Sequence, residues 1–133
     1  MLDITIVPPG IDRGNAWFWA GVASRKLLIQ RCASCGALRV PIAPMCSRCQ
    51  SLAWDTVPAV GRGAILAWIV SRHPTEADAA ARIVALVELE EGVRVVSNVV
   101  DADPSEVRND LAVELTFRTY GGVTLPQFQL ATS

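Results

Sequence analysis

The chain has 133 residues, of which 51% are apolar and 19% are charged. This length suffices for one compact core with a small appendage, and the composition is typical of a globular protein rather than a disordered one. The formal net charge of −1 argues against a dedicated nucleic-acid-binding protein, because that class usually carries a clear basic excess. The apolar runs are too short to span a membrane and the first residues show no secretion signal, so we expect a cytoplasmic protein.

The N-terminal part of the chain predicts a short arm followed by a short helix. A Pro-Pro-Gly sequence at 8–10 ends the arm. Apolar residues between 17 and 28 then favour one short helix or two helical turns, with Asp12 or Asn15 as the N-cap. Three successive aromatic side chains lie here, Trp17, Phe18 and Trp19. They either pack against the rest of the domain or form a docking surface for a partner.

Strand-like runs separated by turn residues predict that the rest of the chain is mainly β. The expected strands are 27–30, 52–59, 64–71, 82–90, 93–101, 112–120 and 124–130. One helical turn is expected at 104–109, where Asp103 is placed to cap it. Tight hairpins are expected at 90–93 and 120–123. Five or six short strands with closing hairpins and one late helical turn favour a small, closed or nearly closed OB-type barrel.

All four cysteines lie in one segment with the spacing C-x2-C-x10-C-x2-C, at Cys32, Cys35, Cys46 and Cys49. Each C-x-x-C pair places two sulfurs on one tight turn, or knuckle, and two facing knuckles supply four thiolates to a tetrahedral ion. Zn²⁺ is favoured because it is redox-inert and tetrahedral, although iron would use the same ligands. A redox pair and two disulfides are less favoured alternatives. Four protein ligands leave no open position, so we expect a structural site and not an active site.

The residues around the cysteines agree with such knuckles, with one exception. Gly36 follows the first pair and suits the positive φ that a knuckle often needs. Gln50 stands at the corresponding position of the second pair, so the second knuckle departs from this pattern. Pro41 and Pro44 stiffen the connection and lower the entropic cost of bringing the two pairs together.

The motifs occur in an order that resembles a known family. They are Phe18-Trp19, the 28–36 segment with the first cysteine pair, Pro41 and Pro44, the second pair, Trp54, Gly61-x-Gly63, the 87–92 segment, Asn98-Val-Val and Phe117. Over about residues 16–128 this order is similar to the family catalogued as domain of unknown function 35. The resemblance implies a mainly β fold with an N-terminal arm and helical segment at 1–26, a rubredoxin-like zinc ribbon at 27–53 and an OB-fold barrel at 54–133. One departure lies at 109–112, where many members carry a Gly-Met-Pro-like turn.

The resemblance also implies a function. Members of this family are typically partners of thiolase-fold enzymes, or parts of acyl-CoA hydratase and aldolase assemblies such as those that degrade steroid side chains. The implied role is a non-catalytic accessory subunit that binds a thiolase-like acyl-CoA enzyme, an aldolase or a thiolase, in a hetero-oligomer. Direct contact with the CoA thioester is a further implied property.

Two other classes of function compete with this one. A stand-alone enzyme needs a nucleophile beside a positioned base, yet the chain has one histidine, His73 in a predicted loop, and one lysine, Lys26. Glu88 and Glu90 share one face of a predicted strand, which is typical of a solvated surface. A single-stranded nucleic-acid-binding OB protein is the alternative, because such proteins stack bases on exposed aromatic side chains. The predicted barrel carries aromatic side chains without interleaved lysines, at Trp54, Trp68, Phe117, Tyr120 and Phe128.

The basic residues are eleven arginines and one lysine. Arginine suits phosphate and carboxylate recognition, because its planar fork donates two parallel hydrogen bonds. The candidates are Arg31, Arg39 and Arg48 beside the knuckles, and Arg62 and Arg72 in predicted loops. We predict that some of these arginines contact an acidic partner surface or CoA phosphates. The simpler alternative is that most are solvated surface charges.

Overall fold

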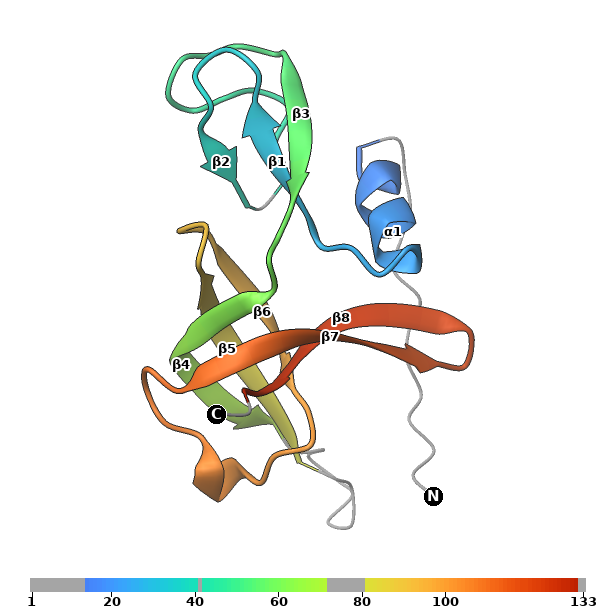
Figure 1. The fold of residues 1–133 in the computed structure, drawn as a ribbon, viewed down its shortest axis with the longest axis vertical. Coiled ribbons are helices and arrows are strands. Elements are labelled where there is room, and N and C mark those ends of the chain that lie inside the picture. Colours follow the sequence, from blue (N-terminus) through green and yellow to red (C-terminus); the bar gives the residue numbers. More distant parts are fainter. Residues whose placement is uncertain (1–13, 41, 72–80, 132–133) are drawn as a thin grey trace. The chain divides into compact units, whose positions relative to one another are not determined.

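The structure, a computed structural model, describes residues 14–40, 42–71 and 81–131 and is drawn in Figure 1. Within this part of the chain there are one α-helix, α1 (Ala16–Ala23), one 3-10 turn, η1 (Pro104–Glu106), and eight strands. The strands are β1 (Leu28–Cys32), β2 (Leu38–Arg39), β3 (Trp54–Pro58), β4 (Arg62–Ser71), β5 (Arg82–Leu89), β6 (Arg94–Val99), β7 (Ala112–Tyr120) and β8 (Val123–Leu130). None of the described helices is long and apolar enough to cross a membrane.

The described residues form two compact units. The first contains the residues up to Ala59 together with Phe117–Pro126, and the second contains Val60–Thr116 together with the residues from Gln127 onward. The first unit holds all four cysteines and α1, and the second holds most of the barrel strands. The cysteines thus belong to one unit and most of the barrel to the other.

The first unit contains a three-stranded antiparallel sheet in the order β2-β1-β3. Its register pairs Arg31 with Asp55 and Cys32 with Trp54, so β1 ends on the first cysteine while still paired to β3. Ile29 and Gln30 of β1 are buried. The sequence does not predict β2, because two residues are too few to show the alternation that marks a strand.

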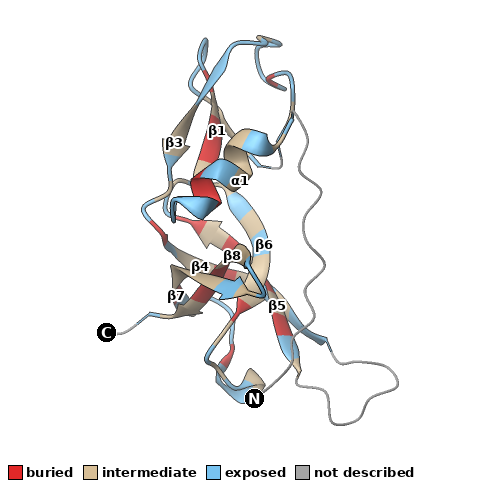
Figure 2. Ribbon diagram, turned by 90° about the vertical axis from the view of Figure 1, so that its right-hand side faces the viewer, coloured by how far each residue is buried: buried red, intermediate tan, exposed pale blue. Residues whose placement is uncertain are grey.

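Helix α1 lies in the same unit and contains no charged residue. Gly21 permits close packing, because a Cβ added there would come within 2.8 Å of the Leu28 side chain. Only Gly21 and Val22 of the helix are buried, and the rest of it is exposed or half-buried, as Figure 2 shows. The helix follows Asn15, whose side chain makes no capping hydrogen bond, while Asp12, the other predicted cap, lies outside the described residues.

The closed barrel has the strand order β4-β5-β6-β8-β7. Strands β6 and β8 run parallel where Val99 meets Phe128, whereas β5 pairs antiparallel with both β4 and β6. Alternate residues of β5 face the core, namely Ile83, Ala85, Val87 and Leu89, and appear as red segments in Figure 2. Because η1 lies between β6 and β7, the order of elements is that of an OB-type barrel, and the predicted fold class is confirmed.

Strand β4 bends through an irregularity between Ile65 and Ala67, which helps a short sheet to curve into a barrel. Gly63, just before it, allows close backbone approach. A Cβ added at Gly63 would lie 2.5 Å from the carbonyl oxygen of Glu88. Any side chain at position 63 would therefore force β4 and β5 apart.

The predicted turns form, with two local adjustments. Asp103 caps η1 as expected, accepting a hydrogen bond from the Ser105 N–H at 2.9 Å. The helical turn is shorter than predicted, because Val107 is extended and buries its side chain. At 109–112, where a Gly-Met-Pro-like turn is missing, Asp110 adopts φ 65° and donates its N–H to the Ile65 carbonyl at 2.7 Å.

Candidate metal centre

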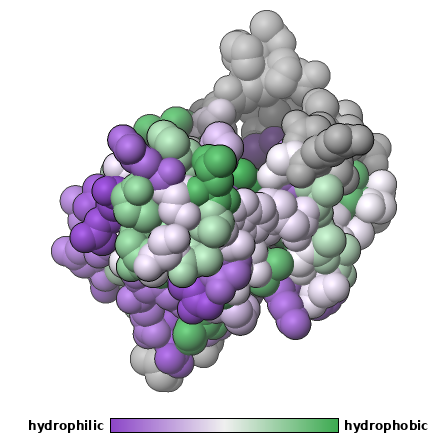
Figure 3. All heavy atoms as spheres, turned by 90° about the horizontal axis from the view of Figure 1, so that it is seen from above, coloured by the Kyte–Doolittle hydropathy of each residue, from purple (hydrophilic) through white to green (hydrophobic). Residues whose placement is uncertain are grey.

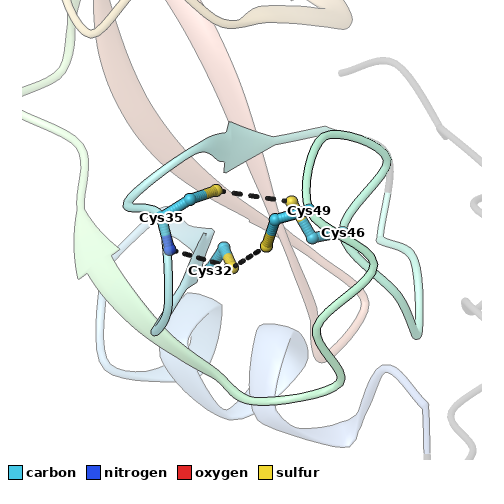
Figure 4. Close-up of side chains that lie close together, drawn as sticks. All are labelled: Cys32, Cys35, Cys46 and Cys49. Carbon is cyan, nitrogen blue, oxygen red and sulfur yellow. Dashed lines mark hydrogen bonds between the residues drawn. The ribbon is translucent and has the colours of Figure 1, made fainter.

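Two loops of the first unit bring the four cysteine sulfurs together. Cys32 ends β1 and Cys35 follows in the next turn, while Cys46 and Cys49 lie in the second turn. All four Sγ atoms lie within 4.8 Å of one another, and Figure 4 shows them converging on one point.

The spacing of the sulfurs agrees with a tetrahedral ion. The Sγ atoms of Cys32 and Cys49 are 3.5 Å apart, and those of Cys35 and Cys46 are 3.6 Å apart. Four sulfurs at the usual zinc–sulfur distance of about 2.3 Å would lie about 3.8 Å from one another. These two distances are slightly shorter than that value, and all the sulfur–sulfur distances are below 4.8 Å, so the cluster is of a size that suits such an ion.

The two knuckles share one backbone design. Gly36 donates its N–H to the Cys32 carbonyl, and Gln50 donates to the Cys46 carbonyl, both at 2.9 Å. Gly36 has φ 79° and Gln50 has φ 63°. The second knuckle thus keeps the left-handed conformation although its residue carries a side chain, which costs backbone free energy that glycine avoids.

Replacing Gly36 with alanine is expected to destabilise the metal-loaded protein by about 1–2 kcal/mol, because alanine is strained at this φ. Steric overlap makes no contribution, since a Cβ at Gly36 would meet nothing within 4 Å. The matched change, Gln50→Gly, should cause no loss. Urea unfolding followed by tryptophan fluorescence measures both variants, and an unaltered Gly36→Ala midpoint would contradict the role given to φ.

Hydrogen bonds set the pKa values of the thiols. The Cys35 N–H donates to Cys32 Sγ at 3.4 Å and is the main cause that lowers the pKa of Cys32 to about 6. Backbone donors, first that of Cys49, also lower the pKa of Cys46. The Ser51 amide lowers the pKa of Cys49, but the neighbouring thiols and burial outweigh it and raise that pKa to about 12. The two buried sulfurs, those of Cys32 and Cys46, are thus the ones whose pKa is lowered, and the thiolate is the form that a metal binds.

The arginines that the sequence suggested as contact residues do not form a single cluster. Arg31 holds Asp55 through two hydrogen bonds of 2.8 Å, which lower the pKa of that carboxyl group. Arg62, in the barrel unit, donates to Glu90 at 2.9 Å. Arg48 is exposed, and Arg72 lies outside the described residues. Contact between any of these arginines and a partner or CoA stays a prediction.

The aromatic residues of α1 form part of a larger cluster that the sequence did not indicate. Trp17 lies against Trp54 of β3, with ring centroids 5.1 Å apart. Phe18 packs edge-on against Trp17 and Trp19, at 6.0 and 5.0 Å. The three aromatic residues of α1 are half-buried and Trp54 is exposed, so the cluster packs internally while keeping accessible surface.

The carboxylates considered for catalysis are engaged in ion pairs. Glu88 accepts from Arg94 at 3.3 Å and Glu90 from Arg62 at 2.9 Å, and all four side chains are largely exposed. These are ordinary surface pairs, which contribute little to stability. His73 lies outside the described residues.

Comparison with known proteins supports this architecture. The family described as "ChsH2, rubredoxin-like zinc ribbon domain" matches residues 19–55, and "ChsH2, C-terminal OB-fold domain" matches residues 56–118. A "DUF35 domain-containing scaffold protein" from Methanothermobacter thermautotrophicus is 35% identical over 104 residues, covering 75% of this chain and 78% of the relative. The chain belongs to the DUF35 family. The zinc-ribbon match includes the four clustered cysteines, a grouping that could hold a metal ion.

Two further proteins are similar to this DUF35 chain. A "Probable enoyl-CoA hydratase alpha subunit" from Thermomonospora curvata is 42% identical over 125 residues, which cover 92% of this chain but 39% of the relative. The chain thus spans about two fifths of the length of that hydratase subunit. A solved structure titled "Ltp2-ChsH2(DUF35) aldolase" matches with a TM-score of 0.86 and 40% identity, covering 93% of this chain and 99% of the matched chain.

Proposed function

We propose that this chain is a non-catalytic accessory subunit of an acyl-CoA enzyme complex, in which another chain carries the catalytic residues. The observation that carries the proposal is the likeness to the Ltp2-ChsH2(DUF35) aldolase chain, which extends over 99% of that chain at 40% identity. The hydratase alpha subunit from Thermomonospora curvata adds a second relative with an acyl-CoA enzyme name. Within the described residues the four cysteines form one cluster, and Glu88 and Glu90 form surface ion pairs.

Zn²⁺ is the proposed occupant of the four-cysteine site. Four sulfur donors within 4.8 Å of one another suit this ion, and the zinc-ribbon family match supports it. Cys32, Cys35, Cys46 and Cys49 would hold the ion, and with four protein ligands it would contribute folding free energy and not an open site for substrate. Elemental analysis of the purified protein distinguishes zinc from iron.

The proposed partner is a thiolase-fold aldolase or thiolase that acts on an acyl-CoA, of the kind used in lipid or steroid side-chain degradation. The aldolase name of the solved relative supports this choice. Arg48, which is exposed in the zinc-ribbon unit, supplies a donor for phosphate groups of CoA. In this arrangement the metal fixes the ribbon while its surface contacts the partner.

The direct test is to mix the purified chain with Ltp2 and to measure complex formation by sedimentation velocity. We expect a stable complex and, with an acyl-CoA substrate, a change in Ltp2 aldolase activity. Fluorescence anisotropy with a 20-nucleotide single-stranded DNA serves as the comparison. Tight binding to the DNA together with no complex with Ltp2 would favour the nucleic-acid-binding alternative and overturn the proposal.

A further inference from the structure

Arg39, at the end of β2, has two terminal guanidinium nitrogens for which the described residues offer no acceptor. Its Nε donates to the Ala43 carbonyl at 3.2 Å. Its Nη1 and Nη2 are shielded from water, and neither meets a hydrogen-bond acceptor among the described residues. By contrast, Arg31 and Arg62 both hold carboxylates. Arg39 therefore differs from them in having no anionic partner among the residues that the structure describes.

The stem of this guanidinium is held by a buried polar network. Gln30 of β1 is paired with Arg39 in the sheet register and is 2% exposed. Its Oε1 accepts the Ala43 N–H at 3.1 Å. Ala43 thus has its N–H bound to Gln30 and its carbonyl bound to Arg39 Nε. The network holds Nε of the guanidinium group in place, while Nη1 and Nη2 find no partner in the described part of the chain.

Unpaired charged donors that are shielded from water destabilise a folded chain, because they lose their hydration without gaining an acceptor. A planar carboxylate is the complementary group, since its two oxygens match two guanidinium N–H groups side by side. Among the described residues, no carboxylate occupies this position. A carboxylate of another chain would complete the pair.

The surroundings of Arg39 are apolar and accessible. Val40 and Ile42 are each 39% exposed, and Met45 is 45% exposed. We call residues 39, 40 and 42–45 the Arg39 loop. Over the face of the molecule drawn in Figure 3, green apolar residues lie beside purple hydrophilic ones. An arginine within an apolar rim is the composition found where a few residues dominate the binding energy of an interface.

We propose that the Arg39 loop is a docking surface for the catalytic chain of the acyl-CoA enzyme complex, and that a carboxylate of that chain, framed by apolar side chains, binds Nη1 and Nη2 of Arg39. This rests on the proposed accessory function and names the surface and the chemistry of its partner. Since both nitrogens are shielded in the isolated chain, docking includes a small rearrangement that uncovers them.

The test uses Arg39→Met, which keeps most of the side-chain length and removes the charge. The isolated variant should melt at the same temperature as the wild type or higher, because it loses an unpaired charge. Its dissociation constant for Ltp2 should rise by about tenfold or more, as expected when one partner of a buried charge pair is removed. The control is Arg108→Met, an exposed arginine of the barrel unit, which should leave both quantities unchanged.

A second variant keeps the test informative if Arg39→Met fails to fold. Arg39→Lys keeps the charge but not the fork, and should also weaken binding to Ltp2 while remaining folded. If both Arg39 variants bind Ltp2 as tightly as the wild type, the inference is wrong and the accessory function stands. If the wild type forms no complex with Ltp2, the accessory function fails and the inference fails with it.

Discussion

Replacing Cys35 with serine is expected to abolish stoichiometric metal binding and to unfold the zinc ribbon. Cys35 Sγ lies 3.6 Å from Cys46 Sγ in the cluster, and a hydroxyl group is a poor substitute for a thiolate ligand. Structural zinc sites contribute about 10–16 kcal/mol of apparent binding free energy. The loss of one ligand therefore removes most of what holds the two knuckles together.

The barrel should survive this change, because its core lies in the second unit. Elemental analysis gives the metal content, and amide exchange measured by NMR separates ribbon residues from barrel residues. Ser34→Ala is the matched control: Ser34 lies beside Cys35 and its hydroxyl makes an exposed hydrogen bond to Ser51. A Cys35→Ser protein with full metal content would show that the ligand set is wrong.

Replacing Phe128 with alanine is expected to destabilise the barrel by about 3–5 kcal/mol, the usual cost of removing a buried phenylalanine. Phe128 is 1% exposed and lies where β8 meets β6. Its carbonyl also accepts the Val100 N–H at 2.7 Å, so the side chain fills the core where the two strands are joined. Small domains have total stabilities of about 5–15 kcal/mol, so this one change removes a large share.

Urea unfolding of the metal-loaded protein measures this effect. The control, Ile69→Ala on β4, removes a side chain that is 65% exposed and should cost within about 0.5 kcal/mol. A loss below about 1 kcal/mol for Phe128→Ala would mean that the barrel does not depend on this residue for its closure.

Much of the barrel was predictable because its strands alternate between core and surface. The expected strand at 112–120 coincides with β7, and Asp103 caps η1 as its position indicated. The length of η1 was not predictable, since it depends on the burial of Val107. In each case the local pattern fixed the type of element, and tertiary packing fixed where it ended.

The clustering of the four cysteine sulfurs was predictable from the spacing alone, because two C-x-x-C pairs on facing turns bring four thiols together. The second knuckle was not, because glutamine rarely adopts the left-handed conformation that Gln50 takes here. The sequence also could not predict that Nη1 and Nη2 of Arg39 would find no acceptor among the described residues. That arrangement depends on a carbonyl of Ala43 that is fixed by Gln30, thirteen residues away in sequence, and no local pattern reports such a relation.

The strand order has a consequence for synthesis on the ribosome. The ribbon sheet uses only β1 to β3, which precede the barrel strands in the chain, whereas the barrel needs β8, the last described strand, to lie between β6 and β7. Pairings between residues so far apart in sequence form slowly. We therefore expect the cysteine knuckles to take up their ion while translation is still in progress, and the barrel to close only after β8 has left the exit tunnel.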